Sequence, residues 1–212
     1  MSIAAEVHVH RDDPDTVGRR ERMGVLLLIV ADVAFVACLM FSYLYLRFLN
    51  VNGLWLPADV TPALTSPTWL VAGALVIGAA VFTFGARQHR TGNKGILVVA
   101  AVIALLASIV AVVLQYGQIV DFDFPTSDKG FLSSAYSSSM LALAGANLFH
   151  IAVTAFVTAG IANRARIGRY AEPPAWQPVF VSYWWIWVAI SAVLVGLMTT
   201  FLVGSPSPPS MG

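Results

Sequence analysis

Five long apolar runs, separated by short polar segments, make up most of the chain. The first run, from Met23 to Arg47, contains a single ionisable side chain in its interior, Asp32. A helix rises about 1.5 Å per residue, so a run of this length crosses the roughly 30 Å hydrocarbon core of a bilayer. The five spans are expected at about residues 24–47, 67–87, 96–116, 135–163 and 179–203. The pattern therefore predicts an all-α polytopic membrane protein in which residues 23–203 form one bundle of five transmembrane helices.

The segments outside these runs predict an orientation. Ten of the twelve lysines and arginines fall in the N-terminal tail and in the second and fourth connections, and only Arg47 and Lys129 fall on the opposite side. Short segments rich in basic residues stay in the cytoplasm. Residues 1–22 are therefore expected to be a cytoplasmic tail, and the Pro/Ser-rich residues 204–212 an outer tail, with the N-terminus inside and the C-terminus outside.

Composition narrows the function classes. Only 11% of the residues are charged, whereas soluble domains carry roughly 25%, so no large soluble domain is expected. The net charge of +1 gives no indication of nucleic-acid binding, and the single cysteine, Cys38, excludes a disulfide framework. His8 and His10 are interpreted as solvated tail residues. The acidic connection around Asp121, Asp123 and Asp128 lacks the spacing of a calcium loop. No metal or cofactor site is expected in this chain.

Asp32 is the first candidate for chemistry. A carboxyl group inside a membrane helix costs several kcal/mol, so its side chain should face protein and not lipid. Two interpretations remain open: proton handling together with a nearby polar group, or a hydrogen bond that only holds two helices together. Tyr43, eleven residues further on, falls on the same helical face and is a secondary candidate.

His150 is the second candidate. With Asn147, Thr154 and Thr158 it forms one polar stripe on an otherwise apolar helix. It is interpreted as a proton relay, a haem ligand or a packing hydrogen bond. No other histidine lies well inside a span, so ligation of haem by two histidines of this chain is excluded.

Three residues are expected to anchor the bundle at the membrane surfaces. Arg47 ends the first span and is long enough to reach the headgroups. Tyr183 and Trp184 open the last span, together with Trp185 and Trp187, and such aromatic clusters are typical of membrane interfaces.

The order of these features resembles the subunit III family of haem-copper terminal oxidases, in its five-span bacterial form. The segment from Gly24 to Arg47, G-V-L-L-L-I-V-A-D-V-A-F-V-A-C-L-M-F-S-Y-L-Y-L-R, is similar to the family's first shared helix, G-x-x-L-F-L-x-S-E-V-x-F-F-x-x-x-F-x-x-Y-x-x-L-R. The alignment has no gaps and places Asp32 at the family's buried glutamate.

Shorter motifs extend the resemblance to about Leu202. They are Trp55 with Pro57 for W-P, Leu114-Gln115-Tyr116 for L-Q-x-x-E/Q, Gly145 to His150 for G-x-H-G-x-H, and Tyr183-Trp184 for the start of Y-W-H-F-V-D. The chain departs from the family in four places. Aspartate replaces glutamate at 32, Asn147 replaces the first histidine of the pair, and Trp185 and Val188 replace the histidine and aspartate of the last helix. The last helix is therefore expected to lose its polar face.

The resemblance implies a non-catalytic subunit in a bacterial plasma membrane. Such a subunit packs on the catalytic subunit I, alongside subunit II, in an enzyme of aerobic electron transport coupled to proton translocation. Haem and copper would lie in the partner subunits, phospholipid would bind in the grooves of this chain, and the buried carboxyl would support proton uptake and turnover stability. Two alternatives remain: an accessory subunit of a related complex such as nitric oxide reductase, or a small proton-coupled transporter using Asp32 and His150.

Overall fold

The protein is a bundle of five long helices with no strand among the residues described. The computed structural model describes residues 13–50, 55–57, 60–122, 134–170 and 175–204. The helices are α1 (Pro14–Leu49), α2 (Thr65–Arg90), α3 (Lys94–Asp121), α4 (Ala135–Arg166) and α5 (Gln177–Phe201). All five are long and apolar enough to cross a membrane, so the five helices expected from the apolar runs are confirmed in the described part of the chain.

α1 begins earlier than the apolar pattern predicts. The helix starts at Pro14, well before the apolar run at Met23, so part of the expected polar tail is helical. A proline fits the first helical position because its fixed φ suits the helix and its missing N–H would have no partner there. At the other end, Asn50 adopts a left-handed conformation with φ 34°, and its N–H donates to the carbonyl of Leu46 at 3.1 Å. This bond closes the last turn of α1.

A capping serine begins α4, and a glycine turn separates α2 from α3. Ser134 caps α4, because its hydroxyl oxygen accepts a hydrogen bond from the backbone N–H of Ser137 at 3.0 Å. A tight turn joins α2 to α3, and Gly92 at φ 99° supplies the left-handed residue that this turn requires. The two helices therefore lie antiparallel and adjacent.

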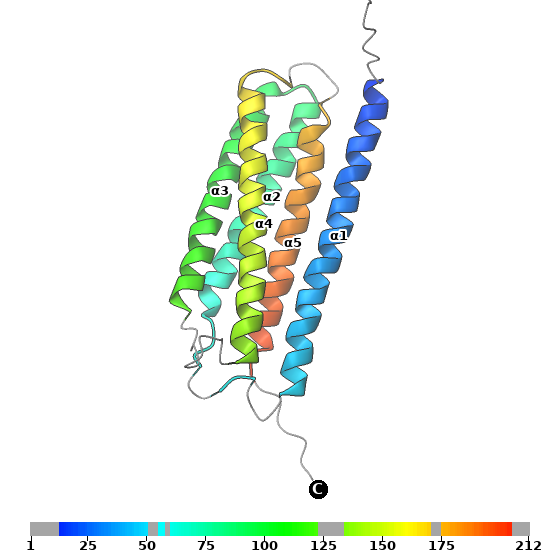
Figure 1. The fold of residues 1–212 in the computed structure, drawn as a ribbon. Helices are drawn as coiled ribbons and strands as arrows, with labels where there is room; N and C mark the ends of the chain where they lie inside the picture. Colours follow the sequence, from blue (N-terminus) through cyan, green and yellow to red (C-terminus); the bar gives the residue numbers. More distant parts are fainter. Residues whose placement is uncertain (1–12, 51–54, 58–59, 123–133, 171–174, 205–212) are drawn as a thin grey trace, which may run out of the picture.

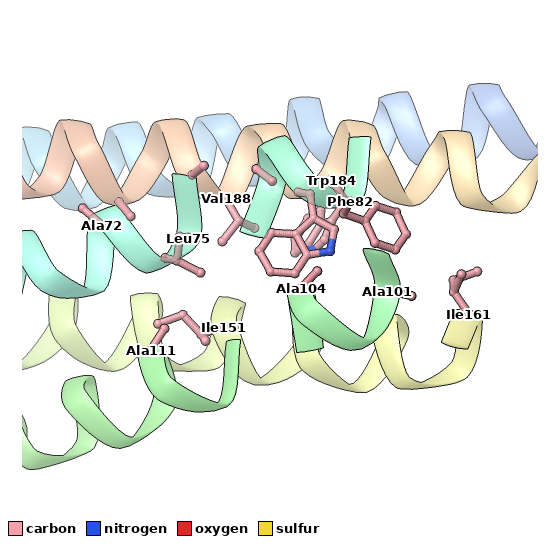
Figure 2. Packing of buried hydrophobic residues seen from close by; sticks show 14 of the residues in the cluster. Ala72, Leu75, Phe82, Ala101, Ala104, Ala111, Ile151, Ile161, Trp184 and Val188 are labelled. Atoms are coloured by element: carbon pink, nitrogen blue, oxygen red, sulfur yellow. The ribbon is translucent and has the colours of Figure 1, made fainter. Parts of the chain in front are cut away.

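The main core lies between α2, α3, α4 and α5. Figure 2 shows part of this cluster, in which small side chains such as Ala101 and Ala104 lie among larger ones such as Phe82 and Leu75. α2 and α3 approach so closely that a Cβ atom on Gly85 would collide with the Cβ of Ala100. Small residues at such a seam let two helix backbones come together without lipid between them.

α1 is the outlying helix of the bundle. It packs against α4 and α5 and stands at one edge in Figure 1. Near its C-terminal end, a second cluster of buried rings (the aromatic end cluster: Tyr43, Trp55 and Tyr136) joins it to the other helices. The Tyr43 hydroxyl donates to the carbonyl of Leu202 at 3.2 Å, and the Trp55 indole donates to that of Val203 at 2.9 Å. This end of α1 is therefore tied to the end of α5.

Candidate functional site: a carboxyl shared by three helices

Asp32 on α1 is held by one side chain from each of the two helices against which α1 packs. Its Oδ1 lies 2.9 Å from Nε2 of His150 on α4, and its Oδ2 accepts a hydrogen bond of 2.6 Å from the indole N–H of Trp187 on α5. The side chain of Asp32 is 14% exposed and that of His150 only 3%. A single carboxyl group thus connects three helices near the middle of the bundle.

Side chains of α1, α4 and α5 surround His150. The Thr154 hydroxyl donates to the backbone carbonyl of His150 at 2.7 Å and accepts from the indole N–H of Trp184 at 2.9 Å. The Trp184 ring stands edge-on to the imidazole, with 6.0 Å between ring centroids, and Phe35 of α1 makes a similar contact at 6.4 Å. Aromatic rings of α1 and α5 therefore stand edge-on to the imidazole, beside its contact with Asp32.

The donor and acceptor roles at Asp32 follow from the chemistry of its partners. An indole N–H can only donate, and an ionised carboxylate can only accept, so Trp187 favours an unprotonated Oδ2. The bond at Oδ1 then needs one proton, which lies on Nε2 of His150 when the carboxyl is ionised, or on Oδ1 when the carboxyl is neutral and Nε2 accepts. The pair can therefore hold a proton between Asp32 Oδ1 and His150 Nε2. Each charge in such a pair is compensated by the other, which lowers the cost of placing them in apolar surroundings.

Trp187 is the site residue that the sequence analysis missed. The aromatic cluster at the start of the last span was interpreted as an interface anchor, and the last helix was expected to lose its polar face. That expectation is wrong, because α5 presents a row of indole N–H donors to the bundle. Trp184 donates to Thr154, Trp185 to Thr158 at 2.9 Å, and Trp187 to Asp32.

A signal for this pairing was present in the sequence. The threonines at 154 and 158 lie one helical turn apart and need donors if they face an apolar core, and buried tryptophan N–H groups usually find an acceptor. Matching this stripe of acceptors with the tryptophans of the last span would have placed their indoles inside the bundle.

Asn147, expected beside His150, belongs to a different network. Its side-chain amide donates to Gln115 of α3 at 2.6 Å, Gln115 donates to Gln118 at 2.9 Å, and Gln118 donates to the Thr68 hydroxyl of α2 at 2.7 Å. We call this series, from Asn147 through Gln115 and Gln118 to Thr68, the amide chain. It links α4, α3 and α2, and among the described residues none of its hydrogen bonds reaches Asp32.

The remaining candidates lie away from Asp32. Tyr43 is fully buried in the aromatic end cluster and bonds the end of α5, so it is no partner of Asp32. Arg47 donates from Nε to the carbonyl of Gly204 at 3.0 Å and also lies over the Phe48 ring. Trp184 is 8% exposed and points into the bundle, which corrects its expected role as a surface anchor. Tyr183 is half-buried where α5 begins.

Among the described residues, no group of three or more histidine, cysteine or acidic side chains gathers as a metal site. His8, His10, Asp123 and Asp128 lie outside the described residues. The sequence matches no protein-family model, and a comparison with curated proteins finds no match. What the buried carboxyl does must therefore be inferred from its own geometry and from the motif residues around it.

Proposed function

We propose that this chain is a non-catalytic subunit of a respiratory haem-copper terminal oxidase, in the position of subunit III, in a bacterial plasma membrane. The observation that supports this best is the contact between Asp32 and His150. One aligns with the buried glutamate of the family's first shared helix, and the other with the last histidine of G-x-H-G-x-H. Two motifs far apart in the sequence thus meet at one hydrogen bond of 2.9 Å.

The basic residues support an orientation in which the N-terminus is inside. Asp32 then lies eight residues beyond Gly24, or about 12 Å along α1 from the cytoplasmic entrance. A carboxyl at this depth is within reach of the side from which an oxidase takes up protons. Trp187 fixes Oδ2 by its indole N–H, which leaves Oδ1 directed at Nε2 of His150.

The proposed role of this chain is to hold a proton and to steady its partners, not to reduce oxygen. Haem and copper of the catalytic subunit carry the redox chemistry. In this chain, His150 and Asp32 share a proton at Nε2 and Oδ1, and the enclosing rings of Trp184 and Phe35 restrict water. The apolar faces of the helices would pack on subunit I, next to subunit II.

Purification of the tagged chain from native membranes in a mild detergent tests the assignment. We expect a haem-containing partner to copurify, with the optical spectrum of a haem-copper oxidase. A chain that purifies without any haem protein contradicts the proposal. A spectrum of the nitric oxide reductase type would assign the chain to that complex instead, and ion flux by the purified chain in liposomes would assign it to a transporter.

The role of the carboxyl is tested in the purified complex with Asp32→Asn. We expect the variant to assemble but to lose proton uptake or to inactivate after fewer turnovers. Ser42→Ala is the matched control, because Ser42 is an exposed polar residue of α1 whose hydroxyl, among the residues described, bonds only the Cys38 carbonyl of its own helix. If Asp32→Asn retains the activity and lifetime of this control, the contact is only structural.

A further inference from the structure

Trp187 of α5 meets Asp32 of α1 at a place where α1 offers little else to the bundle. Residues 24–42 of α1, all described by the structure, bury only one apolar side chain, that of Val36. The bond from the indole N–H to Oδ2 is 2.6 Å long, shorter than the roughly 2.9 Å typical of a neutral N–H···O bond. Bonds to an ionised acceptor are shorter in this way, and about twice as strong. The contact therefore has the features of a donor that faces a carboxylate.

The indole N–H restricts where a proton can sit on this carboxyl. An indole nitrogen donates but does not accept, so Oδ2 keeps its bond to Trp187 only while it carries no proton of its own. One proton then remains to be placed, on the line of 2.9 Å between Oδ1 and Nε2 of His150. Because the indole bond gains strength when the carboxyl is charged, it favours the arrangement with the proton on Nε2. Trp187 thus selects one of two arrangements that the bond between Asp32 and His150 alone leaves open.

The space around the carboxyl also suits an acid no longer than aspartate. Both oxygens already lie at hydrogen-bond distance from a ring nitrogen, Oδ1 from that of His150 and Oδ2 from that of Trp187. A glutamate would add one carbon–carbon bond, about 1.5 Å, and push the carboxyl toward these rings. His150 is 3% exposed, and Trp184 and Phe35 stand edge-on to it, so the imidazole has little room to withdraw. Trp187, which packs at the margin of the main core, is the ring that would have to move.

The two residues that meet at this bond both depart from the motifs that the chain resembles. The first-helix motif has glutamate where this chain has Asp32, and Y-W-H-F-V-D, aligned at Tyr183, has valine where this chain has Trp187. Relative to these motifs the acid is shorter and its α5 partner is larger, at two positions that touch in this fold. The correspondence with the motifs rests on the family resemblance and so on the proposed function, whereas the bond between Asp32 and Trp187 does not.

We propose that Trp187 is a positioning residue for the Asp32–His150 pair and that its ring is matched to the aspartate. Its indole N–H holds Oδ2, keeps the carboxyl ionised and leaves the shared proton on Nε2 of His150. Its ring fills the space that a longer acid would need. In the proposed oxidase the proton would then be held by the imidazole, with Asp32 as its counter-charge, and this last role rests on the proposed function.

Infrared spectroscopy of the purified full-length chain in lipid nanodiscs tests the location of the proton. At neutral pH we expect the unaltered chain to show no carbonyl stretch of a protonated carboxyl that is lost in Asp32→Asn. Trp187→Phe keeps an aromatic ring but removes the donor, so we expect it to show such a band, and the loss of the band in Trp187→Phe/Asp32→Asn assigns it to Asp32. In Trp187→Phe the nitrogen NMR signal of His150 Nε2, identified with His150→Gln, should become that of an unprotonated imidazole nitrogen.

Trp185→Phe is the matched control. It removes an indole N–H from the same helix, one that donates to Thr158 at 2.9 Å and not to Asp32. Because Trp185 is fully buried, we expect the control to lower the midpoint of thermal unfolding at least as much as Trp187→Phe does. It should leave the carboxyl band and the imidazole signal unchanged. Equal spectra for the two variants, or a protonated Asp32 already present in the unaltered chain, would overturn the proposed role of the donor and leave a structural bond.

Lengthening the acid tests its match to Trp187. Asp32→Glu should lower the unfolding midpoint by about 5 °C, as overpacking does in a chain of this size. Introduced into Trp187→Val, the same substitution should have less than half this effect, because the smaller side chain leaves room for the added methylene. Introduced into Trp187→Phe, which keeps a ring at the position, it should have most of it. Trp187→Leu takes the place of Trp187→Val if the latter does not fold.

Equal effects of Asp32→Glu in the unaltered chain and in the small-residue background would overturn the match. All of these measurements use the chain without any partner subunit, so they do not depend on the proposed oxidase. A chain that purifies without a haem protein would contradict the oxidase assignment and leave the role of Trp187 to these spectra. An Asp32 that stays ionised in Trp187→Phe would overturn the role of Trp187 and leave the oxidase assignment to copurification.

Discussion

Replacing Asp32 with alanine should detach the middle of α1 from α4 and α5. The substitution removes both carboxyl oxygens and leaves the indole N–H of Trp187 and the Nε2 of His150 without their acceptor. Both groups lie at helix contacts from which water is largely excluded. The free energy of unfolding should therefore fall by the two lost bonds and by the cost of the unsatisfied donors.

The size of this loss in unfolding free energy can be bounded from typical hydrogen-bond energies. Interhelical hydrogen bonds in membrane proteins contribute about 0.6 kcal/mol on average and up to about 1.7 kcal/mol. Bonds to a charged group lie toward the upper part of this range or beyond it, and a buried donor left unsatisfied costs about 1–3 kcal/mol. For Asp32→Ala we expect a loss of about 3 kcal/mol. For Asp32→Asn we expect about 1 kcal/mol, because the amide oxygen still accepts from Trp187.

The assay is reversible unfolding of the purified chain in mixed micelles, followed by tryptophan emission. Ser42→Ala, an exposed polar deletion on the same helix, should change stability by no more than about 0.5 kcal/mol. Trp187→Phe and the double variant with Asp32→Ala complete a double-mutant cycle, for which we expect a coupling energy of about 1–2 kcal/mol. An Asp32→Ala variant as stable as Ser42→Ala, or a coupling near zero, would refute the reasoning.

Three further predictions concern other parts of the bundle. Gly85→Ala should cost about 1–3 kcal/mol of unfolding free energy, because the added Cβ would collide with Ala100. Gly73→Ala is the control, because its Cβ would meet open space, and it should be close to neutral in the same unfolding assay. Asn147→Leu should cost about 1–2 kcal/mol of unfolding free energy by interrupting the amide chain, measured in the same way. It should leave the activity of the proposed oxidase complex unchanged. Burial raises the pKa of Tyr170 above its ordinary value of about 10. The neutral phenol therefore contributes its full stabilisation below about pH 10, and this contribution is lost as the pH rises through the raised pKa. Tyr170→Phe should flatten the alkaline fall of the unfolding midpoint.

Each of these predictions has an outcome that contradicts it. Equal stability of Gly85→Ala and Gly73→Ala would mean that α2 and α3 do not approach closely at Ala100. A loss of oxidase activity in Asn147→Leu would connect the amide chain to the carboxyl site, which the structure keeps apart. An alkaline fall that persists unchanged in Tyr170→Phe would assign the pH dependence to other groups.

Local properties of the sequence determined much of the architecture. The five helices could be predicted because an apolar run of this length has only one economical conformation in a bilayer, with every backbone hydrogen bond made inside the helix. The direction of Asp32 could also be predicted, since a carboxyl group facing lipid would cost several kcal/mol. The helix α1 begins before the apolar run because charged residues can continue a helix beyond it, and hydropathy predicts only the apolar part.

Which side chains meet was decided only by the tertiary structure. Asn147 and His150 lie three residues apart, and at 100° per residue their directions differ by about 60°. On an isolated helix that difference leaves them on one polar stripe. In the bundle it turns one toward Gln115 of α3 and the other toward Asp32 of α1.

The same reason explains the tryptophans of α5. A sequence gives the order of residues around one helix but not the rotation of that helix against its neighbours, which depends on how all the side chains pack. That rotation turned Trp184 and Trp187 inward, toward Thr154 and Asp32. The chain thus specified its five helices locally, whereas the contacts that give the acid its partners arose from the packing of the whole bundle.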